Sequence, residues 1–353
     1  MRALTVIPGK PDSLAVEEVD APRPAPGEML VRGLALGICG TDREIAAAEY
    51  GSPPPGRQQL VLGHESLGRV EHAPDESGFA AGDLVVGVVR RPDPVPCAAC
   101  ARGRFDMCRN GRYTERGIKG LDGYGSQLWS VSADYAVKLP KNLERTGMLT
   151  EPTSVVAKAW DQVDAIGKRS CFDPERVLVT GAGPIGLLAA LIGAQRGLDV
   201  HVLDRVTSGP KPELVRALGA TYHHGDPGEL AQHIDPDVVI EATGAGEVVF
   251  DVIAETTPTG IVCLTGVSPR GRTLTIDAGA LNRTLVLDNE VVVGSVNASV
   301  EHYRQAVAAL AAADGRWLER LITRRIGLEQ LPKGFAAEKD DVKVVVALDD
   351  SQL

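Results

Sequence analysis

Hydrophobic and polar residues follow two different patterns along the chain. In roughly the first 140 residues, short apolar or alternating runs are separated by glycine and proline, which is typical of strands joined by turns. The predicted strands span residues 29–36, 61–71, 84–89 and 126–131. This part of the chain therefore predicts a twisted, barrel-like β domain.

From residue 176 onwards, apolar strand-like runs alternate with helical stretches, a pattern typical of βαβ units on a parallel sheet. The predicted strands are 176–180, 200–204, 238–242, 261–266 and 291–296, and the predicted helices include 185–196, 212–218 and 300–313. A last strand at 342–348 has no evident partner in this half. We therefore expect the chain to return and complete the first domain.

The composition narrows the class of protein. The 353 residues are enough for two domains, and 44% hydrophobic with 24% charged residues excludes a disordered chain. The longest apolar stretch, residues 185–192, is too short to span a bilayer. The net charge of −10 argues against a nucleic-acid partner, so we expect a small-molecule ligand. The first residues lack an export signal, which predicts a cytoplasmic protein.

The clearest motif is GAGPIG at residues 181–186, directly after one predicted strand and at the start of a helix. In a dinucleotide-binding fold, Gly181 makes the turn, Gly183 lets the backbone approach the pyrophosphate, and Gly186 permits close packing of helix on strand. Asp204 follows Gly186 by 18 residues, near the offset of roughly 20 expected for an acid that binds the ribose. The alternative is a plain glycine-rich turn of an unrelated α/β protein.

The choice between NAD and NADP depends on the end of the next strand. Asp204 can accept hydrogen bonds from both ribose hydroxyls and would repel a 2′-phosphate, which favours NAD. Arg205 and Lys211 are close enough in sequence to reach such a phosphate. We predict NAD as the preferred cofactor and NADP as the second, with Pro184 and Ile185 at the helix start among the contacts.

A second constellation combines residue types that Zn²⁺ favours. Cys39 lies in GICGTD at 37–42, His64 and Glu65 in GHE at 63–65, and Glu151 in TEP at 150–152. Taken singly, these residues read as a buried thiol, a core histidine and ordinary carboxylates. Beside a dinucleotide site, they predict a metal that polarises an alcohol next to a nicotinamide.

These motifs together resemble the zinc-dependent medium-chain alcohol dehydrogenase superfamily. The segments RRP at 90–92, ERGI at 115–118, DGY at 122–124 and GSVN at 294–297 resemble its archaeal-type glucose 1-dehydrogenase branch. The resemblance implies an α/β fold with a GroES-like, β-rich catalytic domain and a doubly wound, parallel-sheet Rossmann domain. It implies a catalytic domain at 1–157, a Rossmann domain at 158–293 and a return segment at 294–353.

The resemblance also implies roles for individual residues. It assigns Cys39, His64 and Glu151 as ligands of a catalytic zinc, and Glu65 as a further ligand or as a supporting carboxylate that exchanges with water. Thr41 matches the hydroxyl that hydrogen-bonds the reacting alcohol.

Two further residues match the sugar contacts of the glucose branch. Glu115 and Asn297 match groups that bind sugar hydroxyls, and Glu151 is counted with them as well as with the metal ligands. The alternatives are a surface acid for Glu115 and a turn residue at a strand end for Asn297.

The predicted reaction is hydride transfer from C1 of a glucose-like aldose to NAD(P), which gives a lactone. Another polyol, an aminocyclitol or a secondary alcohol is the alternative substrate, since fold and metal do not define the ring. A catalytically silent nucleotide-binding protein is the alternative from a different class. We expect a homo-oligomer, either a dimer or a tetramer.

The remaining cysteines divide into a cluster and two isolated residues. The family's structural zinc site has the spacing C-x2-C-x2-C-x7-C, and Cys97, Cys100 and Cys108 occupy its last three positions, with Pro94 at the first. Either an acid such as Asp93 or Glu115 completes the four ligands or the metal is lost, and we favour a bound zinc.

The isolated pair is predicted to lie in the core. These two residues are Cys171 and Cys263.

Overall fold

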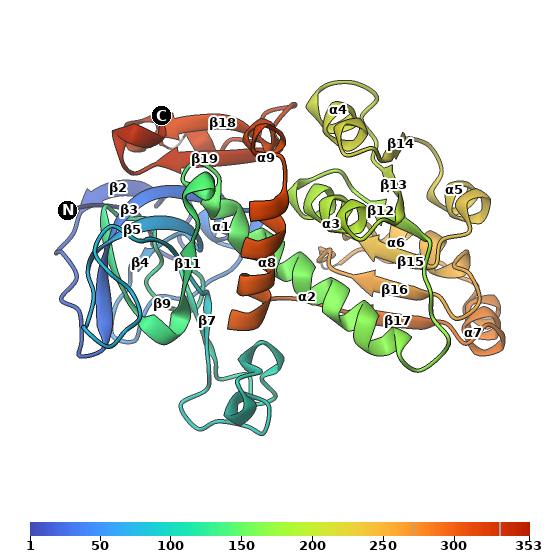
Figure 1. Cartoon of the computed structure of the whole chain (residues 1–353), viewed down its shortest axis with the longest axis horizontal. Coiled ribbons are helices and arrows are strands. Elements are labelled where there is room, and N and C mark those ends of the chain that lie inside the picture. The colour runs from blue at the N-terminus through green and yellow to red at the C-terminus, as the bar shows by residue number, and fades with distance from the viewer. Residues whose placement is uncertain (270, 332) are drawn as a thin grey trace. The chain divides into compact units, whose positions relative to one another are not determined.

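The chain folds into two compact units in the computed structural model, which describes residues 1–269, 271–331 and 333–353 (Figure 1). Unit 1 contains Met1–Ser154 and Asn297–Leu353, and unit 2 contains Val155–Val296. The domain borders expected from the sequence, 157/158 and 293/294, lie three residues from these limits. The assignment of domains stays a prediction.

Unit 1 is built on a seven-stranded sheet in the order β11-β6-β5-β3-β19-β18, with β10 also paired to β3. Its strands are β3 (Glu28–Ile38), β5 (Glu65–His72), β6 (Leu84–Gly87), β10 (Leu128–Ser132), β11 (Ala136–Leu139), β18 (Ile322–Gly327) and β19 (Lys343–Ala347). The C-terminal strand β19 pairs antiparallel with β3, so the end of the chain completes the sheet of the N-terminal half. In Figure 1 this is the red strand beside the blue ones.

Two three-stranded sheets complete the β structure of unit 1. One contains β1 (Arg2–Val6), β2 (Ala15–Glu18) and β4 (Leu60–Val61), and the other contains β7 (Arg90–Arg91), β8 (Thr114–Arg116) and β9 (Gly120–Leu121). The helices of unit 1 are α1 (Gly40–Ala46), α8 (Val300–Ala312) and α9 (Gly315–Leu321). Helix α2 (Thr150–Gly167) begins in unit 1 and continues in unit 2.

The predicted strand at 61–71 is wrong as a single element. Strand β4 ends at Val61 and pairs with β1, whereas β5 begins at Glu65 and pairs with β3 in a different sheet. Gly63 lies between them with φ +96°, a left-handed conformation that is strained for other residues. The break places His64 and Glu65 where β5 begins.

Unit 2 contains a six-stranded parallel sheet in the order β14-β13-β12-β15-β16-β17. Its strands are β12 (Arg176–Thr180), β13 (Asp199–Leu203), β14 (Thr221–His223), β15 (Val238–Glu241), β16 (Ile261–Leu264) and β17 (Val291–Gly294). Its helices, besides α2, are α3 (Pro184–Gln195), α4 (Pro210–Ala217), α5 (Pro227–Ile234), α6 (Gly246–Ala254) and α7 (Ala278–Leu287). This is the doubly wound order 3-2-1-4-5-6, in which ligands bind where the order reverses, between β12 and β15.

One isolated cysteine departs from its predicted place. Cys263 is fully buried in β16, as expected, but Cys171 is exposed in the connection between α2 and β12. The segment around Cys171 does not form a strand, and its side chain faces solvent. In the described part of the chain, no helix combines the length and apolar character that a membrane crossing requires.

Candidate active site

Three candidate metal ligands come together where neighbouring strands of unit 1 end and begin. Cys39 follows β3 and caps helix α1, while His64 and Glu65 stand at the start of β5, which pairs with β3. The donor atoms of Cys39, His64 and Glu65 all lie within 4.8 Å of one another. His64 and Glu65 are buried, so the antiparallel pairing of β3 and β5 gathers the three donors inside the protein.

Asp42 lies against two of these residues, although the sequence prediction gave it no role. Its Oδ2 accepts a hydrogen bond from the backbone N–H of Cys39 at 2.9 Å, and its Oδ1 lies 3.4 Å from Nδ1 of His64. Burial lowers the pKa of His64, but Asp42 and Cys39 outweigh it and raise that pKa well above its usual value. A carboxylate behind a histidine is the usual way in which a metal-binding imidazole is oriented. The spacing of three residues between Cys39 and Asp42, which resembles a capping box, is the signal that could have identified Asp42.

Glu65 has a cationic partner from the far end of the chain. Lys343 Nζ, on β19, donates to Oε1 of Glu65 at 2.6 Å and to Oε2 at 2.7 Å, and it also lies 3.3 Å from the carbonyl oxygen of Ile38. Both side chains are buried. Gly37 makes room for the carboxylate, because a Cβ there would lie 1.9 Å from Oε2 of Glu65. No local pattern could have identified Lys343, which is 278 residues away from Glu65.

Replacing Lys343 by methionine is expected to destabilise the protein by about 3–5 kcal/mol, because the variant leaves the charge of Glu65 buried without its partner. The double variant Lys343→Met/Glu65→Gln should recover a large part of that loss. Urea unfolding of the wild type, both single variants and the double variant measures the coupling energy. Equal stability of the wild type and Lys343→Met in the presence of a chelator would contradict this role.

Glu151 belongs to the same electrostatic neighbourhood. Glu151 lies in the first turn of α2, and desolvation together with the charges of Glu65 and Asp42 raises its pKa to about 7, against opposite effects of His64 and Lys343. Its carboxylate is not one of the three donors that lie within 4.8 Å of one another. Thr41 lies in the first turn of α1, half-buried. The gathered acids make this region one that a divalent cation would stabilise.

The structure brings together the two predicted sugar-binding residues. Asn297 Nδ2 donates to Oε1 of Glu115 at 2.8 Å, across 182 residues of sequence. Glu115 is only 5% exposed, so the alternative of a surface acid is wrong. Asn297 has φ +62° and its Oδ1 accepts from the N–H of Ala298, so it also has the geometry of a turn residue.

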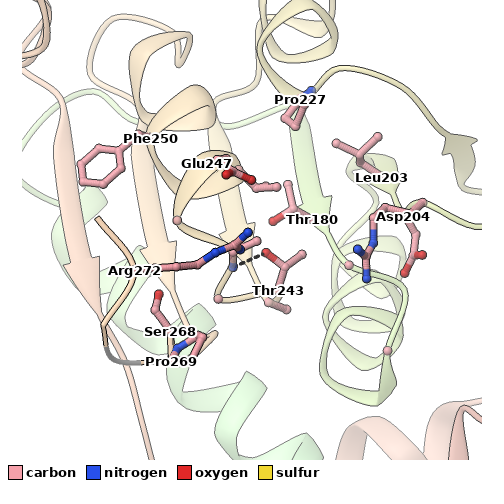
Figure 2. Close-up of a pocket in the computed structure, with 18 of the residues that line it drawn as sticks. Thr180, Leu203, Asp204, Pro227, Thr243, Glu247, Phe250, Ser268, Pro269 and Arg272 are labelled. Carbon is pink, nitrogen blue, oxygen red and sulfur yellow. Dashed lines mark hydrogen bonds between the residues drawn. The ribbon is translucent and has the colours of Figure 1, made fainter. Parts of the chain in front are cut away.

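Unit 2 contains a cavity of about 860 Å³ at the carboxyl edge of its sheet (Figure 2). Four predicted cofactor residues line this cavity: Gly181, Gly183, Asp204 and Arg205. Three others are not among the lining residues. Pro184 and Ile185 form the start of α3, and Gly186 packs so tightly behind the turn that a Cβ there would lie 1.7 Å from the carbonyl oxygen of Gly181.

The loops after β15 and β16 supply cavity residues that the sequence prediction missed. Figure 2 shows Asp204 on one side of the cavity and Ser268 and Arg272 on the other. Buried Glu241 holds the first of these loops, since its Oε1 accepts from the backbone N–H groups of Thr243 at 2.7 Å and Gly244 at 3.0 Å. The glycine-rich segment ATGAG at 242–246, directly after a strand, was the available signal.

Asp204 faces the glycine-rich turn. Its Oδ2 accepts from the N–H of Ala182 at 2.7 Å and from Lys211 Nζ at 3.2 Å, and its Oδ1 accepts from the N–H of Val206 at 3.2 Å. Burial raises the pKa of Asp204, but these hydrogen bonds and the charge of Lys211 outweigh it and lower the pKa overall. Asp204 is therefore an anion at neutral pH.

Comparison with known proteins identifies the family. The family described as alcohol dehydrogenase GroES-like domain matches residues 25–141, and that described as glucose dehydrogenase C-terminus matches residues 144–348. The glucose 1-dehydrogenase of Methanocella arvoryzae is 41% identical over 357 residues, with 99% of each chain covered. The chain belongs to the glucose dehydrogenase branch of the medium-chain alcohol dehydrogenases.

Other relatives agree with this assignment. The dehydrogenase is 40% identical to glucose 1-dehydrogenase 1 of Caldivirga maquilingensis, with 99% of each chain covered. The solved structure of Haloferax mediterranei glucose dehydrogenase in complex with NADP, Zn and gluconolactone is 32% identical, with a TM-score of 0.91 and 99% of each chain covered. The predicted fold class and the prediction of an enzyme are confirmed, against the alternative of a silent nucleotide-binding protein.

The cysteine lobe of this dehydrogenase, residues 97–108, brings three sulfur atoms together. The Sγ atoms of Cys97, Cys100 and Cys108 lie within 4.8 Å of one another, and Cys97 and Cys100 are 3.7 Å apart. That distance is close to the edge of about 3.8 Å in a tetrahedron with Zn–S bonds of about 2.3 Å. Hydrogen bonds from backbone N–H groups, chiefly that of Arg109, lower the pKa of Cys97 to about 6, which favours a thiolate.

Neither acid considered as a fourth ligand joins the three sulfurs among the described residues. Asp93 accepts from the N–H of Val95 at 2.8 Å and from Arg112 at 3.1 Å, and Glu115 is engaged by Arg90 and Asn297. Within the described parts of the chain, the lobe therefore offers three protein ligands.

Proposed function

We propose that this dehydrogenase oxidises C1 of a glucose-like aldose to the lactone, with a nicotinamide cofactor and a catalytic zinc ion. The observation that carries the substrate class is the geometry of Glu115. Its Oε1 accepts hydrogen bonds from Arg90 and Asn297, whereas no described residue donates to its Oε2. A buried carboxylate with one oxygen left unpaired suits a substrate that donates a hydroxyl hydrogen bond. The relatives, among them the Haloferax enzyme with its bound gluconolactone, support the same class.

The donor set fits zinc. Cys39 and His64 supply sulfur and imidazole nitrogen, and Glu151 supplies a carboxylate whose pKa is raised by burial and by the neighbouring acids Glu65 and Asp42. We assign Glu65 to a supporting role, because Lys343 holds both of its oxygens. When bound, zinc would polarise the C1 hydroxyl and the nicotinamide would accept the hydride.

The residues of the chain have separate tasks in this reaction. Asp42 orients Cys39 and His64, and Thr41 is assigned to accept and pass on the hydroxyl proton of the substrate. Glu115 and Asn297 orient the sugar ring. Gly181 and Gly183 line the cavity of unit 2, and the absence of a side chain at Gly183 would let the pyrophosphate of the cofactor come close to the protein backbone.

A substrate panel tests the proposal. Aldoses, polyols, aminocyclitols and simple secondary alcohols are assayed by the absorbance of reduced nicotinamide, each with NAD and NADP. We expect an aldose to give the highest kcat/KM, since a site built for hydroxyls rejects analogues that lack them by large factors. Faster turnover of aliphatic secondary alcohols than of any aldose would overturn the assignment.

We also infer a preference for NAD over NADP, because the anionic Asp204 would repel a 2′-phosphate and Lys211 is already paired with it. The variant Asp204→Asn is expected to shift the ratio of kcat/KM values toward NADP by about tenfold, a difference of about 1.4 kcal/mol. Asp226→Asn, at the start of α5, serves as a control that changes charge by the same amount. A tenfold preference of the wild type for NADP would contradict this inference.

The oligomeric state and the location stay predictions, a dimer or tetramer in the cytoplasm. Exposed apolar side chains on α7 and the edge strand β17, namely Val286, Leu287 and Val292, support an interface between copies.

A further inference from the structure

The guanidinium group of Arg90 contacts three residues through hydrogen bonds and stacking, and it has no role yet in the proposed reaction. Its Nε and Nη2 donate to Oε1 of Glu115 at 3.1 and 3.0 Å. Its Nη1 donates to the carbonyl oxygen of Asp106 at 3.0 Å, and its Cζ lies 3.8 Å from the ring centroid of Tyr113. The residue is 6% exposed, so this guanidinium group has little freedom to move.

The backbone explains why these groups meet. Arg90 and Glu115 are direct partners in the antiparallel pairing of β7 with β8, which places their side chains on the same face. Asp106 belongs to the short 3₁₀ turn Phe105–Met107 inside the cysteine lobe. Arg90 thus joins the strand that carries Glu115 to that lobe.

We propose that Arg90 is a positioning residue for substrate recognition, which holds Glu115 so that Oε2 stays available to a hydroxyl of the sugar. The inference rests on the proposed function. Arg90 and Asn297 place three donors on Oε1 of Glu115 and none on Oε2, so the carboxylate has one defined rotation about its last bond. Without the guanidinium, the carboxylate would be free to turn or to fill its empty hydrogen-bonding positions with water.

The planar fork of arginine is needed here. Two adjacent N–H groups engage one oxygen while a third reaches the Asp106 carbonyl, and the flat face stacks on Tyr113. Lysine keeps the charge but offers neither the fork nor the stacking face. The substitution Arg90→Lys therefore separates the charge of this residue from its geometry.

The test uses the full-length enzyme and the variants Arg90→Met, Arg90→Lys and Tyr113→Leu. KM and kcat are measured with glucose, and the Kd is measured for 1,5-anhydroglucitol, which keeps the ring hydroxyls but has no C1 hydroxyl to oxidise. Arg90→Met is expected to raise both KM and Kd about 30-fold, equivalent to about 2 kcal/mol, with kcat within about threefold of wild type. Arg90→Lys should fall between Arg90→Met and the wild type. Tyr113→Leu should raise KM in the same direction, and it gives the readout if Arg90→Met does not fold.

Arg91→Lys is the matched control, since Arg91 is the next residue of β7 and its guanidinium bonds the carbonyl of Val88 instead of Glu115. An unchanged KM in the Arg90 variants, a loss of kcat at constant KM, or an equal effect of Arg91→Lys would overturn the role of Arg90 alone. A wild-type enzyme that neither oxidises any aldose nor binds 1,5-anhydroglucitol would overturn the proposed function, and the role of Arg90 with it.

Discussion

The variant Cys39→Ala is expected to lose one zinc ion per chain and at least about 1,000-fold in turnover. The thiolate of Cys39 is one of the three donors gathered within 4.8 Å, and a catalytic zinc with only two good protein ligands left is bound weakly. Loss of the metal removes the group that lowers the pKa of the substrate hydroxyl. Metal analysis after dialysis and steady-state assays measure both effects. Cys171→Ala, which removes an exposed thiol, is the matched control.

The zinc content of the wild-type protein also shows whether the cysteine lobe binds a second metal ion. We expect about two zinc ions per chain if the cysteine lobe binds metal and about one after the Cys39→Ala substitution. A wild-type content near one, with the three lobe thiols titratable in the native protein, would show that the lobe holds no metal. Full turnover by Cys39→Ala after exhaustive dialysis against a chelator would refute the catalytic site.

Substitution of Gly186 by alanine should weaken cofactor binding by more than about 100-fold and lower the stability of the protein by about 1–3 kcal/mol. The added methyl group would lie 1.7 Å from the carbonyl oxygen of Gly181, so α3 must move away from the turn that lines the cavity. Titration of the intrinsic fluorescence with NADH and NADPH gives the affinity, and thermal unfolding gives the stability.

Gly183→Ala separates the two effects. Nothing lies within 4 Å of a Cβ at position 183, so this variant should keep the stability of the wild type. Gly183 lines the cavity, where the methyl group would occupy the approach of the cofactor and lower its affinity. If Gly186→Ala instead matched the wild type in both measurements, the tight helix–turn packing would not matter for cofactor binding.

Parts of the fold and the cofactor turn could be predicted because their signals are local. The strand predicted at 176–180 has the same bounds as β12, since a strand buried on both faces of a parallel sheet is a continuous apolar run. The turn at 181–186 follows it directly, and the requirement for Gly186 comes from a contact within the same six residues, with the carbonyl oxygen of Gly181. The run 61–71 misled the prediction, because its apolar pattern continues through Gly63 while the backbone changes sheet there.

The sequence by itself determined the βαβ alternation and the glycine-rich turn, because each depends on neighbours a few positions apart. It also predicted the residue types of a zinc site, although Cys39, His64 and Glu151 lie far apart along the chain. Only the tertiary structure decided how these residues are held. The pairing of β3 with β5 gathers Cys39, His64 and Glu65, and strand β19 delivers Lys343 to Glu65 from 278 residues away. Arg90 meets Glu115 only because β7 pairs with β8 in that register. Buried charges are paired when strands distant in sequence pack together. Hydrophobic periodicity predicts the strands but not which charged residues will pair.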